Sequence, residues 1–346
     1  MQRSATVKDI AQGAEVSIAT VSRVLNNHAN INEDIRQRVL QVAEELGYEK
    51  NEKPLRPRGK NLKEIGFLLA GDVDVDANIF WLPVLQGADM EASKARLRLS
   101  YQGVATNIET SLLIHKILEM RTDGLLLVGP FPPDAVRAVQ ALTIPYVLID
   151  NYMHIPGQTI DAVLSDNIAG IKDAVKYLVS KGHHNIVFVG GHTTASKEIY
   201  TFRQRKVGYI EALQEAGLPL IPELLLEIDV TSIEEINEAC RRLINTQVPF
   251  TAMVCVNDPT ASYMVKALRE HNVRIPQDVS CIGFDDIAIA EHMTPSLTTI
   301  HVHTDLMGSL AVKRLIERNA DPKAVGITYL VDVNLVERDS VIRYQP

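Results

Sequence analysis

The stretch from Thr6 to Tyr48, TVKDIAQGAEVSIATVSRVLNNHANINEDIRQRVLQVAEELGY, decides how the rest of the chain is organised. Its apolar residues recur at helical spacing, which predicts three short helices, the first two arranged as a helix-turn-helix. Thr6 and Asp9 form a start that resembles a capping box. Ser17 and Asn32 are expected to cap the second and third helices, because their side-chain oxygens accept hydrogen bonds from free backbone N–H groups.

The second predicted helix carries small, polar and basic residues opposite its apolar side. Val21, Val24 and Leu25 would point into a core. The outward face would then hold Ile18, Ala19, Ser22 and Arg23. A face of this kind fits a DNA major groove, where the N-terminal residues of the helix meet base edges. The other interpretation is a small helical bundle with a solvated face, and this pattern alone leaves both open.

The composition indicates a globular protein of several domains. A length of 346 residues suggests two or three domains, and 46% hydrophobic with 23% charged residues is typical of folded proteins. The N-terminal MQRSATVKD lacks the apolar run of an export signal, and no segment is apolar enough to span a membrane. The cysteines, which show no metal-binding spacing, are Cys240, Cys255 and Cys281. We therefore expect a cytoplasmic protein with no membrane partner.

The charge is distributed unevenly along the chain. A net charge of −8 disfavours nucleic acid as a partner when it is taken over the whole chain. Residues 1–60, however, carry 10 basic and 8 acidic residues, whereas the remainder carries 25 basic and 35 acidic residues. A slightly basic N-terminal unit on an acidic body concentrates phosphate attraction at one end. Because the basic excess is small, specific contacts must supply much of any affinity for DNA.

From Lys63 onward, short apolar segments alternate with amphipathic helical patterns. Near-continuous apolar strands between helices are typical of parallel sheets covered on both faces. Ten such segments lie between residues 65 and 302, which is too many for one compact sheet, so two sheets are expected. Folds of this class bind ligands in the crevice at the carboxyl ends of the strands. The polar, proline-bearing segment 49–61, EKNEKPLRPRGKN, indicates a linker between the two parts.

Both parts resemble the lactose-repressor/galactose-repressor family of bacterial transcriptional regulators. The N-terminal stretch carries VKDIA, VSIATVSRVLNN and ELGY, and the body carries KGHHNIVFVGG, VNDPTA, VRIPQDVSCIGFDD and PSLTTIHVHTDLMG. The resemblance implies an all-α helix-turn-helix headpiece and an α/β effector domain like the periplasmic sugar-binding proteins, with two parallel-sheet subdomains. The implied limits are 1–48 for the headpiece, 49–62 for the hinge and 63–346 for the effector-binding and dimerisation domain. Within that domain the N-subdomain would take about 63–163 and 297–326, and the C-subdomain about 164–296 and 327–346.

Two features depart from the family pattern. Glu15 stands in the tight turn where the family usually has glycine, and Gly13 lies two positions earlier. A residue other than glycine in a left-handed turn costs about 1 kcal/mol. The hinge reads PLRP at positions 54–57, and its last proline disfavours helical geometry at the preceding residue, so the family's hinge helix is not expected to form. Leu55 remains the candidate minor-groove wedge, and Arg56 a candidate phosphate or minor-groove contact.

The resemblance implies two sets of binding residues. Those expected to meet DNA are Thr6, Ser17, Ile18, Ala19, Thr20, Ser22, Arg23, Asn26, Leu55 and Arg56. Those expected to hold the effector are Asn78, Phe80, Asp150, Asp166, Arg205, Asn257 and Asp285. Planar polar groups suit paired sugar hydroxyls, and an aromatic ring suits the C–H face of a sugar.

Several neighbouring residues also have a structural interpretation. An aspartate at a strand end can cap the following helix, which is the role we prefer for Asp258 and Asp286. Phe80 and Trp81 fit a buried core and a sugar platform equally well. The alternating polar residues of 301–305, HVHTD, share a face as metal ligands would, but they fall in the family's LTTI strand, so no metal site is expected.

No P-loop, GxGxxG, GxSxG or HExxH motif is present, and we expect neither an enzyme nor a cofactor. We interpret the chain as a homodimeric repressor of carbohydrate-utilisation genes, released from operator DNA by a small sugar. The lack of a C-terminal leucine-heptad helix favours a dimer over a tetramer. The hinge prolines and the IAT sequence resemble the galactoside-utilisation branch, so a galactoside is the first expected effector. The alternatives are a co-repressor-dependent regulator of the same family and a free-standing sugar-binding protein, which would need an export signal and no headpiece.

Overall fold

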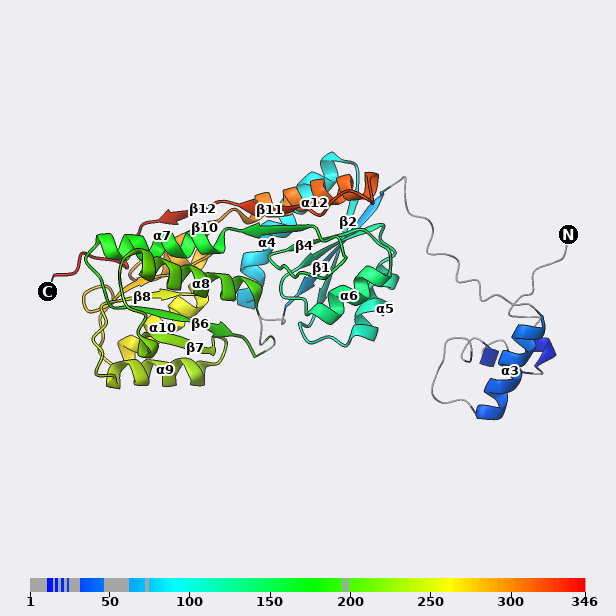
Figure 1. Cartoon of the computed structure of the whole chain (residues 1–346), viewed down its shortest axis with the longest axis horizontal. Helices are drawn as coiled ribbons and strands as arrows, with labels where there is room; N and C mark the ends of the chain where they lie inside the picture. Colours follow the sequence, from blue (N-terminus) through cyan, green and yellow to red (C-terminus); the bar gives the residue numbers. More distant parts are fainter. Residues whose placement is uncertain are drawn as a thin grey trace. The chain divides into compact units, whose positions relative to one another are not determined.

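The computed structural model describes residues 11–14, 16–17, 20–21, 24, 32–46, 62–71, 75–194, 196 and 199–345. The chain forms two compact units, Met1–Arg58 and Gly59–Pro346. Within the described residues, no helix has the length and apolar character needed to cross a membrane. The larger unit contains two lobes, and Figure 1 shows them with β1, β2 and β4 in one and β6, β7 and β8 in the other.

The small unit has an apolar centre shared by its helical segments. Residues 11–13, 20–21 and 24 are helical, and α3 spans Glu33–Glu45. The core consists of Ala11, Ala14, Val21, Val24, Val39 and Ala43. The predicted caps are present, since Ser17 Oγ accepts a hydrogen bond from the Thr20 amide at 3.1 Å and Asn32 Oδ1 accepts one from the Asp34 amide at 2.8 Å.

The first lobe is built on a six-stranded parallel sheet in the order β11-β5-β4-β3-β1-β2. Its strands are β1 (Glu64–Ala70), β2 (Arg98–Val104), β3 (Gly124–Val128), β4 (Tyr146–Ile149), β5 (Ala162–Ser165) and β11 (Thr328–Val331). Its helices are α4 (Val75–Lys94), α5 (Thr110–Met120), α6 (Pro133–Ala141) and α12 (Thr304–Ala320).

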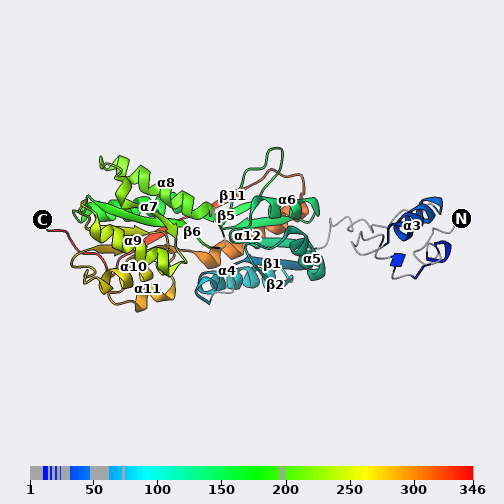
Figure 2. The ribbon, with the colours of Figure 1, turned by 90° about the horizontal axis from the view of Figure 1, so that it is seen from below.

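Alternation along β1 explains how helices cover both faces of this sheet. Ile65 and Phe67 belong to a core with residues of α4 and α12, whereas Leu68 and Ala70 belong to one with residues of α5 and α6. Successive side chains of a strand point to opposite faces, so a continuous apolar run supplies both cores. Figures 1 and 2 both show α4 and α12 side by side on one face.

The second lobe holds a four-stranded parallel sheet in the order β7-β6-β8-β9. Its strands are β6 (Ile186–His192), β7 (Leu225–Asp229), β8 (Ala252–Cys255) and β9 (Ser280–Ile282). Its helices are α7 (Asn167–Ser180), α8 (Tyr200–Glu215), the 3-10 turn η1 (Pro222–Leu224), α9 (Ile233–Asn245), α10 (Asp258–Glu270) and α11 (Ala288–His292). The α/β class with two parallel sheets predicted from the apolar segments is therefore confirmed.

The strands near the C-terminus correct one expected boundary. β10 (Thr299–Val302) and β12 (Val333–Val336) form a separate antiparallel pair. We expected residues 327–346 in the C-subdomain, but 328–331 instead adds β11 to the edge of the first lobe's sheet. The physical reason is that Thr328–Val331 pairs in parallel with Ala162–Ser165, which leaves Val333–Val336 to pair with β10.

Candidate functional site

A cavity of about 440 Å³ lies where the carboxyl ends of both sheets face each other. The first lobe contributes Phe80 and Trp81 from α4 and Asp150 from the end of β4. The second lobe contributes Arg205 from α8, Asn257 after β8 and Asp285 after β9. The volume lies within the usual range for small-molecule sites. The predicted residues Phe80, Asp150, Arg205, Asn257 and Asp285 are thus brought together from both lobes.

Arg205 is the best-connected polar group of the cavity and is only 2% exposed. Its Nε donates to Asn167 Oδ1 at 2.7 Å, its Nη1 to the Val256 carbonyl at 2.6 Å, and its Nη2 to Asp285 Oδ1 at 3.0 Å. The guanidinium carbon lies 3.7 Å from the centre of the Phe284 ring, within cation–π range. Every one of these contacts fixes the guanidinium plane, so Arg205 is held in place before any ligand arrives.

The two cavity aspartates carry unusual ionisation and backbone geometry. Burial raises the pKa of Asp150 to about 7 and that of Asp285 to about 6, although Arg205 lowers both. The nearby Asp285 charge raises the pKa of Asp150 further. Asp150 has φ 57° and Asp285 has φ 107°, in the region that favours glycine. Strained, desolvated carboxyls of this kind are typical of binding sites.

Asp150 also retains an unused hydrogen-bonding atom. Its Oδ1 is buried and has no hydrogen-bond partner in the structure. A buried acceptor without a partner costs about 1–3 kcal/mol, which a ligand donor such as a hydroxyl would recover. Asn257 differs, because its Oδ1 already accepts from the Thr260 amide at 2.9 Å and caps α10. Asn257 therefore combines a structural role with its place on the cavity wall.

Two predicted effector residues are not placed on this wall. Asp166 caps α7 by accepting a hydrogen bond from the Ala169 amide at 3.0 Å, and it does not line the cavity. The competing interpretation of strand-end aspartates as helix caps therefore describes Asp166. Asn78 lies in α4, but its side chain is outside the described part of the structure.

Asp258 and Asp286 are structural, as preferred, but neither acts as the expected helix cap. Asp258 is fully buried and accepts from Thr299 Oγ1 at 2.5 Å and from the Ile287 amide at 2.9 Å, joining three segments. Burial raises its pKa well above the ordinary value. Asp286 pairs with Arg338 Nη2 at 2.7 Å. The corrected roles depend on partners far away in the sequence, which local capping rules do not include.

His301 in β10 and His303 just after it have protein partners rather than a shared ligand position. His301 Nδ1 lies 2.9 Å from Asp286 Oδ2, and His303 Nε2 lies 2.9 Å from Asn334 Oδ1. Their rings are edge to face with centres 4.8 Å apart. In the described part of the chain, no group of three or more His, Cys, Asp or Glu residues is placed to hold a metal ion.

The structure adds cavity residues that the sequence reasoning missed. They include Thr106, Thr193, Thr194, Thr201, Phe202, Thr231 and Tyr263. Thr193–Thr194 directly follow β6 and Thr231 comes two residues after the end of β7, so their position after an apolar strand was an available signal. That signal was overlooked because threonine is common at strand ends and in turns for structural reasons.

Of the residues predicted to meet DNA, only Ser17 and Thr20 are described. Ser17 Oγ lies 2.8 Å from Thr20 Oγ1, at the start of the second helical segment. The other predicted contacts, Thr6, Ile18, Ala19, Ser22, Arg23, Asn26, Leu55 and Arg56, lie outside the described residues, as do Glu15 and the PLRP hinge. Their roles stay predictions.

Comparisons with known proteins agree with both parts of this description. Residues 6–51 match the family of bacterial regulatory proteins of the lacI type, and residues 175–341 match the periplasmic binding protein-like domain. The HTH-type transcriptional regulator RegA of Clostridium saccharobutylicum is 31% identical over 97% of this chain and 99% of its own length. Other relatives of nearly full length are named as transcriptional repressors.

Solved structures have the same fold. A lac repressor dimer bound to operator and the anti-inducer ONPF is 25% identical, with a TM-score of 0.68, and the match covers 98% of this chain and 100% of that one. The transcriptional regulator CelR in complex with cellobiose has the same fold, with a TM-score of 0.71 at 23% identity over 97% of this chain and 99% of its own. These relatives are regulators, in agreement with the expectation that the chain is not an enzyme. The helix-turn-helix headpiece, the two-lobed periplasmic-binding-protein-like fold and the full-length relatives lead to one conclusion: the chain belongs to the lacI family of bacterial regulatory proteins and is a transcriptional repressor.

Proposed function

We propose that this repressor acts in the cytoplasm as a homodimer on operator DNA of carbohydrate-utilisation genes, and that a small sugar bound in the 440 Å³ cavity releases it. The observation that carries the proposal is the position of the Arg205–Asp285 pair and the partnerless oxygen of Asp150. They line one cavity from opposite lobes. A ligand that joins them favours one arrangement of the lobes over another, which is the requirement for a ligand to shift a conformational equilibrium.

A sugar fits the chemistry of this cavity. Carboxylates accept hydrogen bonds from hydroxyls, the guanidinium donates to them, and Phe80 and Trp81 offer aromatic surface to C–H groups. Two carboxyls facing a single guanidinium disfavour an anionic ligand. The cellobiose complex of CelR supports the class of ligand. A galactoside stays our first candidate, on the resemblance of the hinge and of the IAT sequence to the galactoside branch.

The experiment measures sugar binding and operator affinity on the full-length chain. Trp81, the single tryptophan, lines the cavity, so its fluorescence should report binding across a panel of galactosides, other sugars and purines. Asp285→Asn should weaken sugar binding about tenfold or more, because it removes a charge-assisted hydrogen bond. Operator affinity without sugar should be unchanged, while the response to sugar should be lost.

The matched control is Asp278→Asn, because Asp278 pairs with nearby Arg274 and does not line the cavity. It should bind sugar as the wild type does. Wild-type sugar binding by Asp285→Asn would place the effector elsewhere. Tighter operator binding in the presence of the ligand would assign the ligand as a co-repressor.

A further inference from the structure

The cavity extends well beyond the Arg205–Asp285 pair to a second polar group of residues. Thr194 follows β6 and Thr231 follows β7, and both line the cavity. The sheet order is β7-β6-β8-β9, so β7 and β9 are its opposite edges. Thr231 and Asp285 are therefore at opposite ends of the second lobe's contribution to the cavity. We call Thr194, Thr231 and the buried Asp229 between them the threonine subsite.

Asp229 fixes the polarity of this subsite. It is 5% exposed and accepts from Thr194 Oγ1 at 2.7 Å, from Thr231 Oγ1 at 2.6 Å and from the Thr231 amide at 2.9 Å. A hydroxyl has one proton, so each threonine that donates to Asp229 has only lone pairs left for other partners. The two hydroxyl oxygens are 3.3 Å apart. The subsite therefore presents a close pair of acceptors to the cavity and recognises groups that donate.

The edge strands β7 and β9, which lead into the threonine subsite and Asp285, are farther apart than one sugar ring is wide. Neighbouring strands lie about 4.8 Å apart, so the three steps from β7 to β9 span about 14 Å. A six-membered ring with its hydroxyl oxygens, built from bonds of about 1.5 Å, is about 6 Å across. Hydrogen bonds of about 2.8 Å at both ends extend its reach to about 12 Å. The reach of one ring is therefore shorter than the spacing of the two edge strands, β9 before Asp285 and β7 before Thr231.

The volume of the cavity is also larger than the volume of one hexose. A hexose has about 12 carbon and oxygen atoms, and even at the ~30 Å³ that a separate water molecule occupies they would fill only about 360 Å³. Covalent bonds bring those atoms closer together than waters, so the true volume is smaller still. The cavity holds about 440 Å³, which leaves space beyond a single hexose.

We propose that the effector has at least two linked sugar units, and that hydroxyls of the second unit donate hydrogen bonds to Thr194 and Thr231. The proposal rests on the sugar-binding function proposed above and adds the size of the ligand. The first unit binds Asp150, Arg205 and Asp285, which are needed for any sugar. The threonine subsite then selects a disaccharide over its component monosaccharide.

The test is calorimetry on the full-length chain with matched sugars: glucose with cellobiose and maltose, galactose with lactose, and xylose with xylobiose. For the pair that binds, the wild type should hold the disaccharide at least tenfold more tightly than the monosaccharide. The double variant Thr194→Val, Thr231→Val should lose that advantage, with monosaccharide affinity unchanged. The double variant Thr194→Ser, Thr231→Ser keeps both hydroxyls and should restore it, which separates hydrogen bonding from a change of fold.

Thr122→Val is the control, because Thr122 is buried, its hydroxyl has no hydrogen-bond partner, and it does not line the cavity. It should leave both affinities unchanged. Equal wild-type affinity for both members of the binding pair, or a disaccharide affinity untouched by the valine variant, would overturn the threonine subsite while leaving the sugar-binding function intact. Binding of none of these sugars by the wild type would overturn both proposals.

Discussion

Asp150 joins three unusual properties in one residue. Its pKa is raised to about 7, its backbone has φ 57°, and its Oδ1 is buried without a hydrogen-bond partner. The strained backbone and the partnerless oxygen oppose stability at any pH, and the raised pKa does so at high pH, so stability is given up here for binding. Arg205, by contrast, stabilises the fold. Its hydrogen bonds to Asn167, the Val256 carbonyl and Asp285 tie it into the fold, so truncating Arg205 would leave buried groups unpaired and lower the free energy of unfolding by about 3–5 kcal/mol.

The raised pKa of Asp150 predicts a pH dependence of stability. Its ordinary value is 3.8, so between about pH 4 and pH 7 the folded protein holds a proton that the unfolded chain has lost. The stability that the folded protein gains by holding this proton is complete below about pH 4 and disappears as the pH rises through about 7. Asp150→Asn lacks it and should be the more stable protein at pH 8, by up to a few kcal/mol, since a tenfold change in proton affinity is worth about 1.4 kcal/mol.

Urea unfolding followed by Trp81 fluorescence at pH 5 and pH 8 measures this difference for the effector-binding unit. The gap between variant and wild type should widen toward pH 8. A gap of equal size at both values would show that Asp150 is ionised normally in the folded protein.

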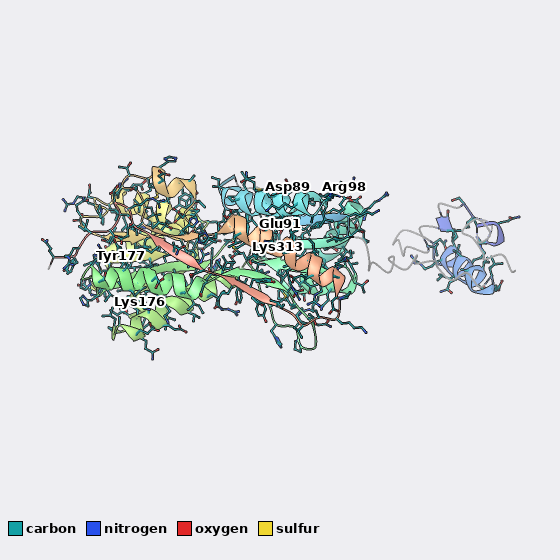
Figure 3. All side chains as sticks on the ribbon, turned by 90° about the horizontal axis from the view of Figure 1, so that it is seen from above. Asp89, Glu91, Arg98, Lys176, Tyr177 and Lys313 are labelled. Atoms are coloured by element: carbon teal, nitrogen blue, oxygen red, sulfur yellow. The ribbon has the colours of Figure 1, made fainter. Side chains whose placement is uncertain are left out.

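The α4–α12 pair shows which contacts hold an element in place. A Cβ added at Gly87 would lie 1.9 Å from the Asp305 carbonyl oxygen, and one added at Gly308 would lie 2.0 Å from the Val84 carbonyl oxygen. The helices thus approach backbone to backbone. Figure 3 shows Glu91 of α4 near Lys313 of α12, and this ion pair spans 3.9 Å at the surface. With Lys313 half exposed and the two charged atoms this far apart, the pair contributes about 0–1 kcal/mol, so close packing at the glycines dominates.

Gly308→Ala should therefore force the helices apart and lower the free energy of unfolding by about 1–3 kcal/mol or more, as overpacking does. Gly71→Ala is the matched control, because a Cβ there would meet nothing within 4 Å. Thermal unfolding of both variants compares them directly. Equal melting temperatures for Gly308→Ala and wild type would mean that α4 and α12 tolerate a wider separation.

At the scale of the whole molecule, the cavity is connected to the strands that run between the lobes. The Asp285 amide donates to the Ile300 carbonyl at 2.8 Å, and the next residue, Asp286, contacts both His301 and Arg338. A ligand that moves Asp285 therefore acts directly on β10 and on the segment after β12. In the proposed dimer, a shift of the lobes would alter the spacing of the two headpieces and their simultaneous fit to operator half-sites.

The headpiece predicts which substitutions change operator choice. Ile18 and Ala19 are predicted to lie on the outward face near the N-terminus of the second helix, where base edges would be read, so replacing both should change which operator is preferred. Arg23→Ala should instead weaken binding to all operators, as loss of a phosphate contact does. Gel shifts on an operator library would distinguish the two effects. An unchanged preference after the double replacement would rule out base reading by these residues.

Patterns within short stretches of sequence were enough for much of this protein. The caps at Ser17 and Asn32, the apolar strands and the polar residues after them all depend on neighbours a few positions away, because helical and strand periodicities are local. The cavity aspartates and Arg205 were found in this way, with the family resemblance.

Contacts between distant residues decided the rest. The transfer of 328–331 to the first sheet depends on pairing with β5, and the role of Asp258 depends on Thr299, both far away in the chain. The threonine subsite exists only because β6 and β7 place Thr194 and Thr231 on either side of Asp229. Such partners are set by how the elements pack, and sequence spacing does not encode that packing in any local pattern.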